Sequence, residues 1–143
     1  MNNVNIEYSA SSILEAAAPL IELAIAEDVG PGDVTSQATL PPALSLRAVI
    51  VAKGAGVVAG LPVAGAVFAR VEPAIRFTPQ MRDGDRVSPG DVVAGVVGPA
   101  RGVLTAERTA LNFLQRLSGI ATLTRTFVDA VAGTRAVILD TRE

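Results

Sequence analysis

Apolar residues recur at helical spacing near the start of the chain, and a polar, glycine-rich stretch follows. Residues 11–26 predict a helix, because apolar positions lie three or four residues apart: Ile13, Ala17, Leu20, Ile21 and Ala24. Pro19 predicts either a kink in this helix or the first turn of a second one. The sequence EDVGPGD at 27–33 has the composition of a turn.

The middle of the chain alternates short apolar runs with turn signals. Residues 44–51 predict a strand, with one face formed by Leu44, Leu46, Ala48 and Ile50. A short helix is predicted at 61–69, and further strands at 74–78, 91–97 and 100–104. Turn residues at 83–85 and 88–91 separate the later strands. This pattern predicts a small α+β unit with a mostly antiparallel sheet.

The pattern changes at Thr105, which predicts a helix N-cap with Glu107 in the first turn. Ser118 and Gly119 predict a break, and a second helix is predicted from about 120 to 132. The apolar run at 136–139 predicts a strand covered on both faces. We therefore expect a boundary at 102–106 that divides the chain into residues 1–104 and the opening of an α/β domain at 105–143.

Composition narrows the classes of protein that fit. Half of the 143 residues are apolar and 18% are charged, which favours a packed core over disorder. The net charge of −2 gives no support for a nucleic-acid or membrane partner. The chain contains no cysteine and no histidine, which excludes disulfides and thiolate metal sites and removes the usual general base. No signal peptide or spanning segment is visible, so we expect a cytoplasmic protein.

Arginine dominates the basic residues, because Lys53 is the only lysine among the 12. Arginine recognises carboxylates and phosphates through two parallel hydrogen bonds, which points to anionic ligands. A genome that favours arginine codons would give the same composition. Arg108, Asn112 and Gln115 form one polar stripe on a predicted helix. The stripe is either a solvated face or an arginine presented to an anion, including across a subunit interface.

Three further groups of residues could carry chemistry. Asp140, Thr141 and Arg142 end the last predicted strand, where they either hold a ligand or pair with one another. Asp28 and Asp33 flank a glycine turn and could bind a metal or form Asx turns. Biotinyl and lipoyl carrier domains have turns similar to those at 83–91, and they modify a lysine at a hairpin tip. Lys53 is the candidate here, but its neighbours do not match the carrier motif.

Six ordered motifs resemble one known family, quinolinate phosphoribosyltransferase, also called nicotinate-nucleotide pyrophosphorylase (carboxylating). They are EDVGPGDVT at 27–35, GVVAG at 56–60, DGDRV at 83–87, LTAERTALN at 104–112, LSGIAT at 117–122 and DTR at 140–142. The resemblance covers residues 20–143 and implies an N-terminal α/β sandwich joined to an incomplete α/β barrel. This chain would supply the α+β sandwich, the connecting helices and the first barrel strand, in a homodimer or larger assembly.

The resemblance also implies an activity in NAD biosynthesis. The family transfers phosphoribosyl from phosphoribosyl pyrophosphate to quinolinate, giving nicotinate mononucleotide, pyrophosphate and CO2 with Mg²⁺. Both substrates are polyanions, so binding requires fixed positive charge. The displacement passes through an oxocarbenium-like state, for which positioning matters more than a side-chain nucleophile. The resemblance places the Mg²⁺ ligands and the catalytic residues outside this chain, and we expect the chain alone to have no turnover.

Four substrate-binding residues follow from the resemblance. Arg108 would reach a quinolinate carboxylate in the neighbouring subunit, while Arg142 would bind a carboxylate from the first barrel strand with help from Thr141. Glu143 stands where the family has a lysine. A carboxylate about 4 Å from the ligand would be repelled by roughly 4 kcal/mol at an effective dielectric near 20. This departure leaves open a related protein found beside molybdate transport genes. A separate alternative is a non-enzymatic module that dimerises or carries a cofactor.

Overall fold

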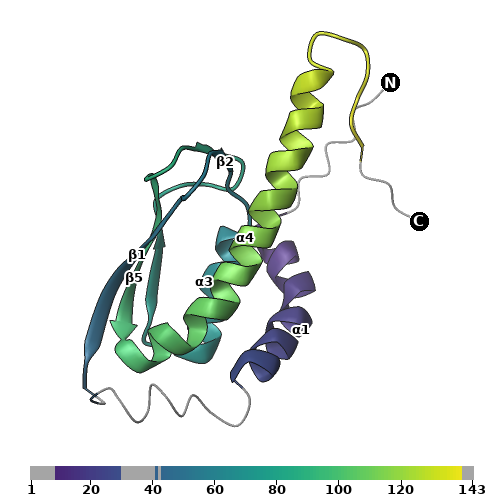
Figure 1. Ribbon diagram of the computed structural model, residues 1–143. Helices are drawn as coiled ribbons and strands as arrows, with labels where there is room; N and C mark the ends of the chain where they lie inside the picture. The colour runs from purple at the N-terminus through teal and green to yellow at the C-terminus, as the bar shows by residue number, and fades with distance from the viewer. Residues whose placement is uncertain (1–8, 30–40, 42, 140–143) are drawn as a thin grey trace.

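The computed structural model describes residues 9–29, 41 and 43–139, and these form three layers (Figure 1). A three-stranded sheet has the order β1 (Ser45–Val51), β5 (Val92–Pro99) and β3 (Arg76–Pro79). Helices α3 (Leu61–Val71) and α4 (Ala100–Ala130) pack against the sheet. Helix α1 (Ala10–Val29) packs against α3 and α4, on their side away from the sheet. The mixed α+β class is therefore confirmed.

The sheet is antiparallel throughout, as the sequence predicts. Strand β5 pairs with β1 on one side and with β3 on the other. Along β1, half-buried and exposed residues alternate, and Leu46, Ala48 and Ile50 share the inward face. A second, two-stranded sheet joins β2 (Gly56–Val57) to β4 (Arg86–Val87) and lies against α4.

The core lies between the three-stranded sheet and the two helices that cover it. Phe68 of α3 is fully buried and stacks on Phe77 of β3, with ring centroids 5.7 Å apart. Small and branched side chains fill the remaining space, among them Val63, Ala64, Val67, Val93, Val96, Val103, Ala106, Ala110 and Leu114. This core holds the first half of α4 firmly against the sheet.

Helix α1 extends the predicted helix at both ends. The Ser9 hydroxyl accepts a hydrogen bond from the Ser12 amide at 3.2 Å, which satisfies one of the free amides at the helix start. Pro19 lies inside this single helix, so the alternative that it starts a second helix is wrong. The predicted helix at 61–69 is confirmed as α3.

The 31-residue helix α4 overturns three local predictions. Residues 100–104 are helical and not a strand, because Pro99 ends β5 and the helix begins directly after it. Thr105 is therefore not an N-cap, and Glu107 is not in the first turn. Ser118 and Gly119 do not break the helix. A glycine inside a helix costs about 1 kcal/mol, which the hydrogen bonds made by neighbouring residues of α4 offset.

The C-terminal part of the described chain also differs from expectation. Residues 136–139 form no strand, because a lone strand has no neighbour to accept its backbone hydrogen bonds. The side chain of Leu139 is 77% exposed. No part of a barrel is seen in the described residues. The predicted boundary at 104/105 falls within α4, and the division into two domains stays a prediction.

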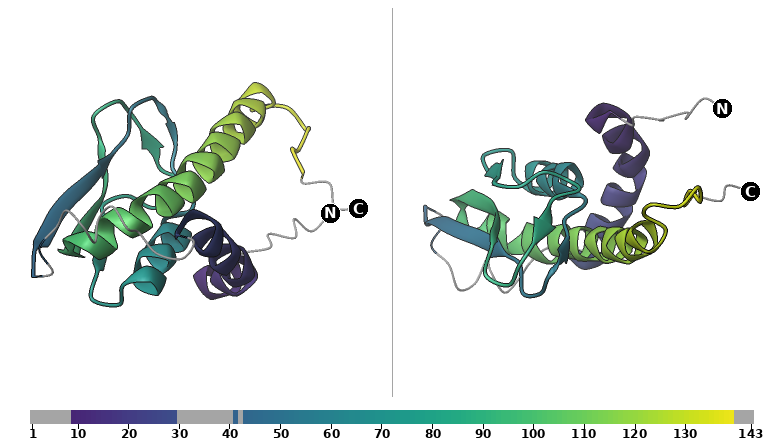
Figure 2. Two further views of the ribbon diagram at one scale, coloured as in Figure 1. Left: turned by 60° about the horizontal axis from the view of Figure 1, so that its bottom comes forward. Right: turned by 90° about the horizontal axis from the view of Figure 1, so that it is seen from above.

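The second half of α4 projects beyond the body of the molecule (Figure 2). It carries exposed apolar side chains, namely Ile120, Leu123, Phe127 and Val128. Nothing in the described ranges covers this apolar surface. None of the described helices is long and apolar enough to cross a membrane.

Candidate functional site

Arg108 is the predicted substrate-binding residue that the structure places. Its side chain is exposed on the first half of α4, on the same ridge as Asn112 and Gln115. The opposite face of the helix is buried through Val103, Ala106, Ala110 and Leu114. Thr141, Arg142 and Glu143, with Asp140, lie outside the described residues.

The Arg108 ridge runs between two hollows of the surface. A cleft of about 420 Å³ between α1 and α4 is lined by residues that include Glu27, Asp28, Asn112 and Arg116. A groove of about 790 Å³ between β1 and α4 is largely apolar and includes Gln115 at its edge. Within the part of the chain that the structure describes, the Arg108 guanidinium has no hydrogen-bond or ion-pair partner. It is therefore available to an anion that approaches from outside the chain.

Thr109, the next residue, points the other way and is only 2% exposed. Its hydroxyl donates a hydrogen bond of 2.6 Å to Oδ2 of Asp28, in the last turn of α1. Asp28 is thus a helical residue. The Asx turn predicted for it would reach residue 30, which lies outside the described residues, so it stays a prediction. No three acidic side chains of the described residues gather as they would around a metal ion. Asp33 lies outside the described residues.

The GVVAG and LSGIAT motifs bind each other. The Val57 amide donates to the Thr122 hydroxyl at 2.9 Å, and the Ala59 amide donates to the Ser118 hydroxyl at 3.0 Å. A Cβ on Gly56 would lie 2.7 Å from Thr122 Oγ1, so only glycine allows this approach. These motifs hold β2 against α4, a role that the sequence did not reveal.

The DGDRV motif also has a structural role. The Asp83 carboxylate accepts hydrogen bonds from the Gly60 amide at 2.9 Å and the Leu61 amide at 3.0 Å. These amides lie at the N-terminus of α3, where a carboxylate also interacts favourably with the helix dipole. The Asp85 carboxylate accepts a hydrogen bond from the Arg82 amide at 2.7 Å, which closes the turn.

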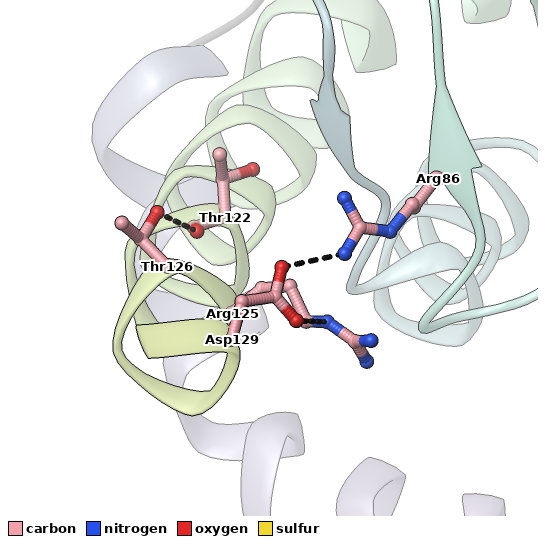
Figure 3. A network of polar contacts seen from close by, with 5 residues as sticks. All are labelled: Arg86, Thr122, Arg125, Thr126 and Asp129. Carbon is pink, nitrogen blue, oxygen red and sulfur yellow. Dashed lines mark hydrogen bonds and ion pairs between the residues drawn. The ribbon is translucent and has the colours of Figure 1, made fainter. Parts of the chain in front are cut away.

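An ion-pair network links the projecting half of α4 to β4 (Figure 3). Arg86 of β4 lies 2.6 Å from the Asp129 carboxylate, and Arg125 contacts its other oxygen at 2.8 Å. The hydrogen bond from Arg86 is the main cause that lowers the pKa of Asp129. Desolvation opposes it, and the hydrogen bond and charge of Arg125 lower the pKa further. All three side chains are largely exposed, so solvent and salt screen the network.

Acidification is expected to release this network. Because the folded pKa of Asp129 is lowered, its contribution to stability is present above the unfolded value near 3.9 and is lost as the pH falls through the folded pKa. An NMR titration of the Asp129 carboxyl carbon measures this directly. We expect Arg86→Ala to raise the apparent pKa more than Arg125→Ala does. An unchanged titration in Arg86→Ala would contradict the assignment.

Lys53 does not occupy the position that a carrier domain requires. It follows β1 and precedes β2, but these two strands do not pair with each other. Lys53 is therefore not at the tip of a hairpin between them, and the carrier alternative loses its structural basis.

Comparison with known proteins gives the family. Residues 33–118 match the family described as "Quinolinate phosphoribosyl transferase, N-terminal domain". The chain belongs to this family. Among curated relatives, it is 44% identical over 125 residues to quinolinate phosphoribosyltransferase (decarboxylating) 1 of Nicotiana glauca, covering 87% of this chain and 35% of the relative. It is 42% identical over 132 residues to the nicotinate-nucleotide pyrophosphorylase (carboxylating) of Mycobacterium leprae. That match covers 90% of this chain and 46% of the relative.

Solved structures of the family share the fold. NadC from Streptococcus pyogenes superposes with a TM-score of 0.85 at 38% identity, over 90% of this chain and 47% of that one. The nicotinate-nucleotide pyrophosphorylase from Francisella tularensis superposes with a TM-score of 0.86 at 28% identity, over 99% of this chain and 49% of that one. This chain thus spans between about a third and a half of the length of the relatives it matches.

The names of the relatives place them in different compartments. A relative from Arabidopsis thaliana is described as chloroplastic and one from Nicotiana tabacum as mitochondrial. A cytoplasmic location stays a prediction for this chain.

Proposed function

We propose that this chain acts as the N-terminal part of an enzyme that transfers phosphoribosyl from phosphoribosyl pyrophosphate to quinolinate with loss of CO2. The observation that carries the proposal is Arg108. It lies in the LTAERTALN motif of a family member, on a rigid helix, exposed and unpartnered within the described residues. A guanidinium held in this way can form two parallel hydrogen bonds with a carboxylate of a dicarboxylate substrate.

The remaining parts of the site would come from elsewhere. Arg142, with Thr141 beside it, is proposed to bind a second carboxylate, and Glu143 to lie next to the ligand. The described residues offer no group of acidic side chains that fits Mg²⁺. As the family resemblance implies, we propose that the Mg²⁺ ligands lie outside this chain, and we derive no step through the ion.

The outer half of α4 supports the proposed second domain. Its apolar residues are about half exposed and form a surface that water solvates poorly, and burying the exposed part of each would contribute about 1 kcal/mol. An α/β barrel domain packed on this surface, in a homodimer, would explain why the helix extends beyond the sandwich. It would also bring Arg108 of one protomer toward the ligand of its partner.

Calorimetric titration of quinolinate into the purified chain tests the proposal. We expect binding that Arg108→Ala weakens about 30-fold, because a charged hydrogen-bonded contact is worth about 2 kcal/mol. Arg101→Ala is unsuitable as a control, because Arg101 has an interaction of its own. Arg47→Ala serves instead, since Arg47 is exposed on β1, a different element from the ridge. Equal affinity of Arg108→Ala and the parent chain would remove Arg108 from the site.

The isolated chain is expected to have no turnover. The residues proposed to bind the ribosyl diphosphate and Mg²⁺ lie outside it, so the transition-state charge has no stabilising partners. An assay for nicotinate mononucleotide with both substrates and Mg²⁺ measures this. Product formed by the chain alone above the enzyme-free rate would contradict the expectation.

A further inference from the structure

Two acidic residues stand where helix physics disfavours them. Glu27 and Asp28 occupy the last turn of α1, which contains no basic residue. The helix dipole makes this end negative, so each carboxylate is locally unfavourable by a few tenths of a kcal/mol or more. Helix stability therefore does not explain why an aspartate stands at position 28. The tertiary contact explains it, because Oδ2 of Asp28 accepts a 2.6 Å hydrogen bond from Thr109.

Thr109 is the fully buried polar residue of the described core, and it adjoins Arg108. Each residue of a helix is rotated about 100° from the previous one, so fixing the direction of Thr109 also fixes that of Arg108. Among the described residues, the Thr109 hydroxyl donates its hydrogen bond to the Asp28 carboxylate. A broken bond would leave a buried hydroxyl unsatisfied, which restricts the helix to the rotation that keeps the bond.

The buried face of α4 mixes small and large apolar side chains around Thr109. Ala106 and Ala110 lie closest to it in sequence, and Val103 and Leu114 are buried farther along the same face. Apolar packing holds the helix against the core, and a buried hydrogen bond adds a directional restraint. Buried polar contacts are known to fix helix register where apolar packing does not.

Several side-chain contacts between α4 and other elements lie farther along the helix. Ser118 and Thr122 bind the β2 segment, and Asp129 pairs with Arg86. Ser118 is ten residues beyond Arg108, about 15 Å along the helix axis. The hydrogen bond between Thr109 and Asp28 thus ties α4 to α1 directly beside Arg108.

We propose that Asp28 is a positioning residue, which aims the Arg108 guanidinium by fixing the rotation of α4 through Thr109. The effect of this positioning on ligand binding rests on the function proposed for Arg108 above. Glu27 provides a matched control, because it is an exposed carboxylate in the same turn and cleft and makes no hydrogen bond to the described part of α4.

Spin-label distances test the positioning without any ligand. The chain has no cysteine, so labels attached through Arg47→Cys and Arg108→Cys report the position of residue 108 relative to β1. Labelled chain is diluted with unlabelled chain, so that only distances within one chain are measured. We expect one narrow distance in the parent and a shifted or about twofold broader distribution with Thr109→Val or Asp28→Ala.

Two variants separate positioning from stability. Thr109→Ser keeps the hydroxyl and should restore the narrow distance, and Glu27→Ala should leave it unchanged. If Thr109→Val fails to fold, the distance in Asp28→Ala decides whether the contact positions residue 108. Asp28 is exposed, so its truncation leaves no cavity. An unchanged distance in folded Asp28→Ala, or an equal change in Glu27→Ala, would overturn the proposal.

Quinolinate titration of the same variants, with Arg108 retained, gives the functional result. If the parent binds, we expect Asp28→Ala to bind about tenfold more weakly, Glu27→Ala to bind normally and Thr109→Ser to recover most of the affinity. A normal affinity in Asp28→Ala would refute the positioning role in binding. If the parent does not bind quinolinate, the proposed function fails for this chain, and the distances alone decide whether Asp28 orients residue 108.

Discussion

Gly60→Ala is expected to lower the free energy of unfolding by about 3–4 kcal/mol. Gly60 precedes α3 with φ of 96°, a left-handed conformation that costs a residue with a Cβ roughly 1–2 kcal/mol. A Cβ there would also lie 2.6 Å from Cδ1 of Leu117, on α4. Overpacking of this kind costs about 1–3 kcal/mol. Urea denaturation followed by circular dichroism measures the sum.

Two other glycines separate these contributions. Gly84 has φ of 97° and nothing within 4 Å, so Gly84→Ala should show the backbone cost alone. Gly54 has neither feature, and Gly54→Ala should be nearly neutral. Adding Leu117→Ala to Gly60→Ala should remove the steric part relative to Leu117→Ala alone. If Gly60→Ala and Gly84→Ala cost the same, the close approach to Leu117 does not matter.

Asp83→Ala is expected to cost about 3 kcal/mol. Asp83 is the side chain that satisfies the Gly60 and Leu61 amides at the start of α3, and both residues are buried. Hydrogen bonds to a charged group are worth about 1.5–3 kcal/mol each, and partial exposure reduces that value here. The change leaves two amides without a partner and removes a favourable charge from the positive end of the helix.

The same denaturation experiment checks this result with graded variants. Asp83→Asn keeps one acceptor oxygen and should cost about half as much. Asp91→Ala is the control, since Asp91 accepts one amide, that of Ser88, in an exposed turn far from any helix start. A cost for Asp83→Ala no larger than that for Asp91→Ala would show that capping of α3 is unimportant.

The sequence pattern predicts an element of the sandwich well where its buried residues recur with the period of a strand or of a helix. Strand β1 is the clearest case, because Leu46, Ala48 and Ile50 of the predicted face point inward. Leu44, also predicted on that face, precedes the strand and is exposed. The pattern fails for α4, whose predicted strand, N-cap and break are all helical. Thr105, Ser118 and Gly119 are residues that locally favour caps and ends. Here the hydrogen bonds of Ser118 and Thr122 to the β2 segment keep the helix continuous.

The candidate site also has one part that the sequence predicts and one part that it does not. Helical spacing placed Arg108 on a polar ridge, and the family resemblance supplied its proposed role. The contact between Asp28 and Thr109 joins residues 81 positions apart and has no local period. The sequence does show that Asp28 stands near a predicted helix end, where the helix dipole disfavours an acid. That position does not identify Thr109 as its partner.

The sequence by itself determined the α+β class, the antiparallel sheet, the family and the exposed arginine of α4. These follow from periodicity and ordered motifs, which are properties of neighbouring residues. Only the tertiary structure decided that α4 is one helix, that GVVAG and LSGIAT bind each other, and that Asp28 holds Thr109. The physical reason is that hydrogen bonds of buried polar groups depend on what the fold brings within about 3 Å, and sequence distance does not specify that.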